Sequence, residues 1–268
     1  MRKTSYLSLA LLVIFSGLSA RSLAEADGTV LAQKVYDRPD GRDVTTKSTM
    51  VLESKRHKRR YRTLYTYRMD TNEGETRSLI RFTEPADITD TGMLTLDNPG
   101  QESSQWVYLP ALDRARRIAS SRKGGHFVGS DLYYEDLQKR DVNKDHHRIL
   151  GEGKVGKIVT TKLESIPVDP DNSAYSKRIS WIHAKTLIPL KVDYFNAYSE
   201  QPVKRLKVTK IKKIQGYWTV LDSSMTDLDD DKQTRMITET IRYDQELPEK
   251  LFSRQALSDT QLEDAFRP

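Results

Sequence analysis

A period-two alternation of apolar and polar residues dominates the chain after residue 42. From Tyr61 to Met69 the odd positions hold tyrosine, threonine and methionine, whereas two of the even positions hold arginine. From Ile188 to Tyr194 the apolar residues occupy the even positions instead. This period is typical of strands that bury one face, and it predicts roughly ten to twelve of them. The expected strands are Thr45–Ser54, Tyr61–Met69, Arg77–Phe82, Gly92–Asp97, Gln105–Leu109, Arg148–Gly153, Lys157–Ile166, Arg178–His183, Ile188–Tyr194, Lys204–Ile214, Tyr217–Thr226 and Ile237–Tyr243.

Turn-forming residues separate these segments, for example at Asn98-Pro99-Gly100 and at Gln215-Gly216. Successive strands with short connections pair antiparallel, so the pattern predicts one large curved sheet or a barrel. Helical patterns are few: we expect short helices at Thr29–Asp37, at Asp131–Lys139 with Asp131 as the N-cap, and after Pro248. With no repeat or linker in view, residues 27–268 are expected to form a single domain.

The first 26 residues resemble an export signal. Arg2 and Lys3 precede an apolar run that ends near Leu18, and Ala24-Glu25-Ala26 fits the A-x-A cleavage pattern. The run is shorter than the roughly 20 apolar residues of a membrane span. We therefore expect residues 1–26 to be a cleaved signal peptide and the mature protein to be periplasmic. The alternative is an uncleaved anchor helix.

The composition argues against a lipid-anchored protein and against a nucleic-acid-binding protein. The chain has no cysteine, so we expect neither disulfides nor the N-terminal cysteine that carries the lipid of a bacterial lipoprotein. The formal net charge is +6. Cleavage of the signal would leave about +4, an excess well short of that of a nucleic-acid-binding protein.

No motif indicates catalysis, a metal or a cofactor. Residues Ser120–Lys123 have the S-x-x-K spacing of serine acyl-enzymes, but the companion S-D-N and K-T-G motifs are missing. Asp141 begins a partial calcium-loop pattern in which His146 stands where glycine is required. No dinucleotide or Walker pattern occurs. We therefore expect a protein that is not an enzyme.

The most patterned stretch runs from Gln105 to Leu137. It joins an aromatic strand to an arginine cluster, a glycine-rich bend and an aromatic–acidic segment. Together with upstream residues it resembles the bacterial outer-membrane lipoprotein-sorting proteins, the LolA-like group, in the branch associated with RND/MMPL-type exporters. The resemblance rests on Phe82-Thr-Glu-Pro85, Gly92, Trp106-Val-Tyr108-Leu109-Pro110, Arg114, Arg116-Arg117-Ile118, Phe127-Val-Gly129-Ser130-Asp131 and Tyr134-Glu135-Asp136-Leu137.

This resemblance implies a mainly β fold: a large antiparallel sheet curled into an incomplete, half-open β-barrel with a lid of short helices. It implies a periplasmic carrier or chaperone that shuttles a lipid or lipidated protein between inner and outer membrane, with an RND-type exporter as partner. Two alternatives stay open. One is an adaptor of an export complex without lipid cargo, and the other is a lipid-modifying hydrolase.

Bulky aromatic residues on the expected inner face predict an apolar ligand cavity, although a filled core explains the same pattern. The cavity candidates are Tyr65, Tyr67, Phe82, Trp106, Tyr108, Phe127, Trp181, Tyr194 and Trp218. Glycines beside Phe127 predict a movable lid, with a fixed loop as the alternative. The lid and hinge candidates are Gly124, Gly125, Gly129 and Asp131.

The sequence also contains two clusters of basic residues. Residues 55–60 are expected at a hairpin tip, where they would touch anionic head groups or an acidic partner, or simply stay solvated. The membrane or partner contacts are Lys55, Arg56, Lys58, Arg59 and Arg60. The second cluster, Arg114, Arg116 and Arg117, is expected to pair with Asp131, Glu135 and Asp136 and so to pin the lid.

Overall fold

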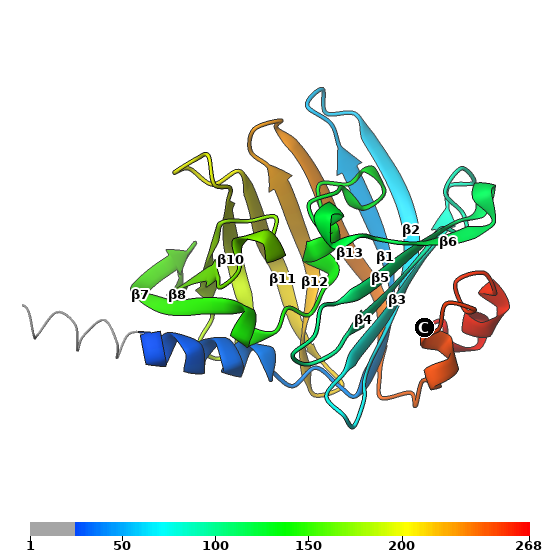
Figure 1. Cartoon of the computed structure of the whole chain (residues 1–268), viewed down its shortest axis with the longest axis horizontal. Coiled ribbons are helices and arrows are strands. Elements are labelled where there is room, and N and C mark those ends of the chain that lie inside the picture. Colours follow the sequence, from blue (N-terminus) through cyan, green and yellow to red (C-terminus); the bar gives the residue numbers. More distant parts are fainter. Residues whose placement is uncertain (1–24) are drawn as a thin grey trace, which may run out of the picture.

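The computed structural model describes residues 25–268, which form one helix, eight short 3-10 helices and a single antiparallel sheet (Figure 1). The predicted signal peptide falls almost wholly on residues 1–24, outside the described residues. The strands are β1 Asp43–Glu53, β2 Arg59–Asp70, β3 Thr76–Glu84, β4 Gly92–Asp97, β5 Ser104–Leu109, β6 Arg114–Arg117, β7 Asp145–Val155, β8 Ile158–Pro167, β9 Lys177–Ile182, β10 Pro189–Phe195, β11 Lys204–Ile214, β12 Tyr217–Asp227 and β13 Lys232–Tyr243.

The sheet order is β6-β5-β4-β3-β2-β1-β13-β12-β11-β10-β9-β8-β7, so the pairing of β1 with β13 joins the two halves. Within the described chain β6 and β7 each have a single neighbouring strand, and the curled sheet does not close. This is the predicted half-open barrel, and that prediction is confirmed. The 3-10 helices are η1 Pro110–Leu112, η2 Ser120–Arg122, η3 Phe127–Gly129, η4 Tyr134–Leu137, η5 Val142–Lys144, η6 Pro170–Asn172, η7 Glu249–Phe252 and η8 Thr260–Phe266.

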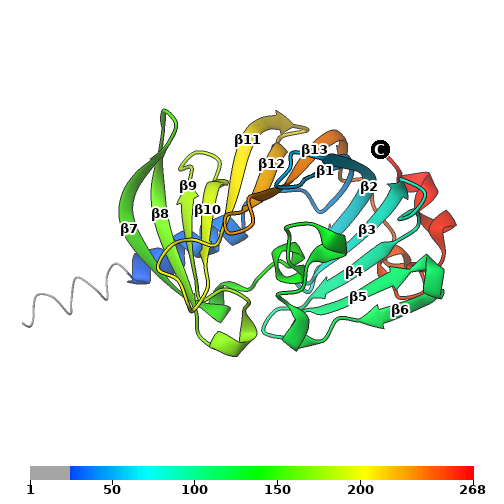
Figure 2. The same ribbon diagram turned by 90° about the horizontal axis from the view of Figure 1, so that it is seen from above.

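The connection between β6 and β7, residues 118–144, crosses the concave side of the sheet (Figure 2). We call it the strap. Leu132, Tyr134 and Leu137 of the strap pack against a core of the concave face. That core consists of Met50, Leu52, Leu64, Ile80, Phe82, Ile88, Met93 and Phe127. The strap therefore supplies the cover that an exposed apolar sheet face needs.

The convex side is covered by residues 244–268, the C-terminal segment (Figure 2). Arg81 of β3 is fully buried there and donates from Nε to Glu263 Oε1 at 3.0 Å and from Nη2 to the Ala256 carbonyl at 2.9 Å. Asp43 accepts hydrogen bonds from the backbone N–H groups of Gln245 and Glu246 at 2.8 and 2.9 Å. Because a buried charge is stable only when paired and hydrogen-bonded, these contacts fix the segment on the sheet.

The helix at residues 25–36 lies along the end of the sheet that carries β7 (Figure 1). Ala32 packs with Leu163 and Ile182 in a separate core cluster. A Cβ at Gly28 would lie 2.6 Å from the His147 carbonyl oxygen, so only glycine permits this approach. The predicted helix at Thr29–Asp37 is confirmed, with an earlier start. No helix among residues 25–268 has the length and apolarity that crossing a membrane requires.

All twelve predicted strands are present, with ends that shift by a few residues. One strand was missed, and one predicted helix was wrong. The strand β6 was not expected, because Arg114–Arg117 has no apolar alternation. The helix expected at Asp131–Lys139 is only the four-residue η4, whose N-cap is Tyr133; Asp131 binds Thr234 instead.

Candidate functional site: the cavity beneath the strap

A cavity of about 460 Å³ lies between the concave sheet face, the strap and the end of the helix. Strands β1 to β4 and β13 form its floor, and the strap forms its cover. Its lining consists of Val35, Tyr36, Arg38, Asp40, Met50, Leu64, Thr66, Arg68, Thr76, Ser78, Ile80, Asp97, Phe127, Leu132, Asp136, Leu137, Gln138, Lys139 and Met236.

Polarity changes along the cavity in the direction of β2. Leu64, Thr66 and Arg68 follow one another on one face of this strand, because side chains two apart point the same way. The Leu64 end packs with Met50 and Phe127. At the other end the Arg68 guanidinium donates to Asp70 Oδ2 and to the Asp40 carbonyl, both at 2.6 Å. The cavity therefore has one apolar end and one charged end.

Hydrogen bonds fasten the strap to the β2–β5 side of the sheet. The Arg62 guanidinium donates to the Val128 carbonyl at 2.6 Å. The Gln105 side chain donates to the Tyr134 carbonyl at 2.9 Å. The backbone N–H of Lys139 donates to Asp97 Oδ2 at 2.9 Å.

A buried polar cluster fastens the strap to the opposite side. The Lys204 ammonium donates to the Asp131 carbonyl at 2.7 Å and lies 3.0 Å from the centre of the Tyr133 ring. Burial lowers the pKa of Lys204 to about 8. The Asp131 carboxylate accepts from the Thr234 hydroxyl at 2.7 Å, and burial raises its pKa.

Asp136 forms the inner part of this cluster. Its carboxylate accepts from the backbone N–H of Tyr133 at 2.7 Å and from the Tyr175 hydroxyl at 3.0 Å. Burial raises the pKa of Asp136 to about 6, because these two hydrogen bonds and the Lys204 charge offset only part of the desolvation. The strap is thus held by groups whose charged forms are less favourable here than in water.

Two of the aromatic cavity candidates lie on the concave face in contact with each other. Phe127 lines the cavity, and its ring centre is 5.7 Å from that of Phe82. Tyr194 also faces the strap side, but it packs against Tyr175 at 4.5 Å inside a filled cluster with Val192 and Met225.

Four candidates lie on the convex face, so the expectation that they share the cavity is corrected. Tyr65, Tyr67, Trp106 and Tyr108 pack with the C-terminal segment. The physical reason is the strict alternation of a strand: once Leu64 and Thr66 face the strap, Tyr65 and Tyr67 must face the other side.

The last two candidates also lie outside the cavity lining. Trp181 is half-buried beneath Lys191 of the neighbouring strand, whose ammonium is 3.6 Å from the ring centre. Trp218 is half-buried in β12, and its carbonyl accepts from Arg38 at 3.3 Å. The residues that replace these aromatics in the cavity, such as Thr66, Ser78 and Met236, carried no distinctive sequence pattern.

The predicted hinge glycines all lie in the strap. Gly129 has a φ of +69°, and a Cβ there would meet open space. Gly124 and Gly125 are close to Ala174 and to the Arg122 carbonyl. Val128 has a φ of 48°, which is unusual for a β-branched residue. The predicted pinning arginines do not reach the strap carboxylates: Glu135, for example, binds Ser173 and Arg140 instead.

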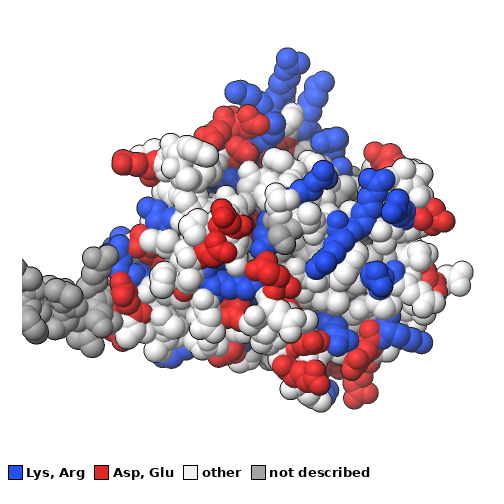
Figure 3. Space-filling model, in the orientation of Figure 1, with Lys and Arg blue, Asp and Glu red and all other residues white. Residues whose placement is uncertain are grey.

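The basic residues 55–60 form the tip of the β1–β2 hairpin, as expected. All of them are exposed, and the tip projects at the top of the molecule in Figure 3. Arg59 and His57 both bind Glu53, at 2.7 and 3.0 Å. Tyr61 beside the tip is 59% exposed. The tip therefore presents several cations and one aromatic ring to the surroundings.

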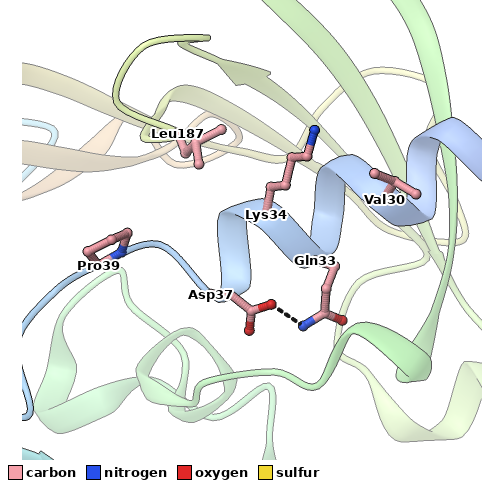
Figure 4. Close-up of a pocket in the computed structure, with 6 residues that line it drawn as sticks. All are labelled: Val30, Gln33, Lys34, Asp37, Pro39 and Leu187. Carbon is pink, nitrogen blue, oxygen red and sulfur yellow. Dashed lines mark hydrogen bonds between the residues drawn. The ribbon is translucent and has the colours of Figure 1, made fainter.

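A second, shallow hollow of about 410 Å³ lies beside the helix (Figure 4). Gln33 donates to Asp37 at 2.8 Å along its floor. The lining consists of Val30, Gln33, Lys34, Asp37, Pro39 and Leu187. Elsewhere, the part of the chain from residue 25 onward contains no group of three His, Asp or Glu residues placed to hold a metal.

Comparisons with known proteins agree with this architecture. A family model described as an uncharacterized protein matches residues 74–259. A DUF1329 family protein from Desulfovibrio piger is 30% identical, with a TM-score of 0.83 over 87% of this chain and 99% of that chain. A structure described as an outer membrane lipoprotein-sorting protein domain, from Vibrio parahaemolyticus, is 29% identical, with a TM-score of 0.82 and the same coverage.

A LolA superfamily protein from Nitrosomonas europaea shares the fold, with 16% identity and a TM-score of 0.66 over 85% of this chain and 98% of that chain. A search among curated proteins finds no match. The resemblance inferred from the sequence is thereby confirmed at the level of family and fold. The chain belongs to the DUF1329 family, and its fold is that of the LolA superfamily.

Proposed function

We propose that this protein is a periplasmic carrier that shelters an acyl chain of a lipid or lipidated protein in the cavity beneath the strap. The observation that carries the proposal is the cavity itself, with its apolar end at Met50, Leu64 and Phe127. Its volume of about 460 Å³ lies within the range of about 300–1,000 Å³ that is typical of small-molecule sites. The likeness to a domain described as lipoprotein-sorting supports the same role.

The energetics favour such a cargo. Each methylene group that leaves water gains about 0.8 kcal/mol, so a single acyl chain supplies a strong driving force for binding. The charged end of the cavity around Arg68 offers hydrogen-bond donors and acceptors to a polar head group. Carriage requires a shielded volume and no covalent step, so we propose a binding role without catalysis.

Loading requires that the strap move or that the cargo enter at its edge. We propose that the glycines at 124, 125 and 129 let the strap shift, with Phe127 as the apolar group that leaves the cavity. The basic tip of the β1–β2 hairpin would meet the membrane during transfer. The proposal has three further parts, which rest on the sequence. The N-terminal signal exports the protein. The protein shuttles between inner and outer membrane, and an RND/MMPL-type exporter is its partner.

The proposal is tested by a substitution that fills the cavity with a bulky side chain. Thr66→Trp places an indole on the cavity floor, whereas Thr49→Trp makes the same change on the neighbouring strand, on the opposite face from the cavity-lining Met50. After incubation with phospholipid vesicles, native mass spectrometry should show lipid adducts on the wild type and on Thr49→Trp. We expect Thr66→Trp to carry at least about tenfold less lipid, because overpacking excludes the chain.

Equal lipid occupancy in the two tryptophan variants would contradict the cavity as the binding site. A wild-type protein that acquires no lipid at all, including when purified from its host, would favour the adaptor without cargo.

A further inference from the structure

Among residues 25–268, the β6 edge of the sheet has no strand paired to its outer side. At the other end of the sheet the helix at residues 25–36 packs against the β7 backbone at His147 and Arg148. Strand β6 ends the sheet order and pairs only with β5 among the described residues (Figure 2). The backbone N–H of Ile118 donates to the Gln105 carbonyl at 2.8 Å. Since antiparallel pairing alternates, the backbone groups of Ala115 and Arg117 point away from β5.

This edge carries uncompensated positive charge. Arg114, Arg116 and Arg117 are exposed, as is Arg122 just beyond the strand, and Figure 3 shows basic side chains gathered over this end of the sheet. Within the described residues, the side chains of Arg114, Arg116 and Arg122 make no hydrogen bond or ion pair. Arg117 reaches the Ser104 hydroxyl at 3.3 Å and the Trp106 ring at 6.0 Å.

The charge excludes some occupants and favours others. A second copy of this chain pairing through β6 would set arginine against arginine, and like charges opposite each other in a sheet are destabilising. An extended acidic segment would instead satisfy both features at once. Its backbone would bond the outward groups of Ala115 and Arg117, and its carboxylates would accept from the arginines.

We propose that β6 is a docking edge for an acidic segment of a partner protein, which adds to the sheet as a further strand. The site is separate from the cavity and does not depend on lipid binding. Arginine suits this role because its planar guanidinium binds carboxylates through two parallel hydrogen bonds.

The experiment uses the full-length mature protein and a fluorescent peptide of about eight residues that alternates glutamate with valine and threonine. Its controls are the same peptide with lysine for glutamate and one with a central proline. Hydrogen exchange in the wild type should show new protection at amides 115 and 117 when the acidic peptide binds. Binding should weaken as salt rises, because the charges are exposed.

Two variants separate charge from backbone pairing. The triple variant Arg114→Glu, Arg116→Glu and Arg117→Glu should weaken binding by at least about tenfold. Its matched control, Lys207→Glu with Lys210→Glu and Lys212→Glu, makes the same charge change on exposed positions of the interior strand β11 and should bind normally. Ala115→Pro removes one outward N–H without changing charge, a substitution that edge strands tolerate, and it should also weaken binding.

Unchanged affinity in a folded Ala115→Pro variant would overturn the proposal, because it would mean that charge alone attracts the peptide. The absence of new protection at amides 115 and 117 would overturn it as well, and this measurement decides the matter if that variant does not fold. Equal binding of the lysine peptide, or binding of vesicles with anionic lipid through the same arginines but not of the peptide, would also contradict it.

Discussion

Single buried charges hold the two covers of this sheet in place. Arg81 fixes the C-terminal segment through Glu263 and backbone carbonyls, and Lys204 fixes the strap through the Asp131 carbonyl. Removing one partner of such a pair leaves an uncompensated buried charge. The loss of folding free energy is then larger than the contribution of the intact pair. These residues explain why the covering segments have defined positions although they contain little regular structure.

The raised pKa of Asp136 gives a stability prediction with a definite sign. Between its ordinary value of about 4 and its folded value of about 6, the folded protein binds more protons than the unfolded chain. The free energy of unfolding should therefore fall as pH rises through this interval, by up to about 3 kcal/mol, and this group should add no further change above it.

Asp136→Asn should remove that part of the pH dependence. Urea denaturation at several pH values between about 4 and 7 measures it for the variant and the wild type. Asp229→Asn, at an exposed hairpin position, serves as the control and should keep the wild-type slope. An unchanged slope in Asp136→Asn would show that another group titrates in this range.

At the scale of elements, the strap is the segment on which the proposed function depends. It is anchored on both sides of the concave face, by Arg62 and Gln105 on one side and by Lys204 and Thr234 on the other. Loading by strap movement must break one of these sets. The Lys204 side is the natural candidate, because its ammonium and carboxylates are already disfavoured by burial.

A disulfide between strap and sheet tests this movement. The chain has no cysteine, so a single engineered pair is unambiguous. Asp131→Cys with Thr234→Cys replaces two residues whose side chains are in direct contact, with the Thr234 hydroxyl oxygen 2.7 Å from Asp131 Oδ2. We expect the oxidised variant to lose uptake of a fluorescent fatty acid and to regain it on reduction. Equal uptake in both redox states would show that cargo enters without release of this anchor.

Prediction from sequence succeeded for elements with strong periodicity and failed where the pattern was polar. β4 and β11 have the predicted bounds because Gly92–Asp97 and Lys204–Ile214 lie between clear turn residues. Strand β6 was missed since four residues of Arg-Ala-Arg-Arg carry no buried face of their own. The helix expected after Asp131 was wrong because hydrogen bonds to the sheet replaced the continuing helical ladder.

At the scale of the whole molecule, the basic hairpin tip gives the protein a polarised surface. Tyr61 beside the tip adds an amphipathic ring of the kind that suits a membrane interface. We propose that this end of the molecule approaches an anionic membrane, where each basic residue contributes about 1 kcal/mol.

Reversing four charges at the tip tests the orientation. Lys55→Glu, Arg56→Glu, Lys58→Glu and Arg60→Glu leave the Glu53 partners in place, and sedimentation with vesicles containing anionic lipid should show at least about tenfold weaker binding. The control reverses four exposed lysines of β11: Lys207, Lys210, Lys212 and Lys213. Equal loss in both variants would mean that net charge, and not the tip, governs membrane contact.

Sequence alone predicts the mainly antiparallel β architecture, the positions of twelve strands, a helix at Thr29–Asp37 and the family, because these follow from local periodicity, turn chemistry and motif. Which face of each strand encloses the cavity emerges only from the folded molecule. The aromatic face of β2 meets the C-terminal segment, and the face with Leu64, Thr66 and Arg68 meets the strap. Alternation specifies two faces for every strand, but long-range packing selects the cover for each, and no local pattern contains that choice.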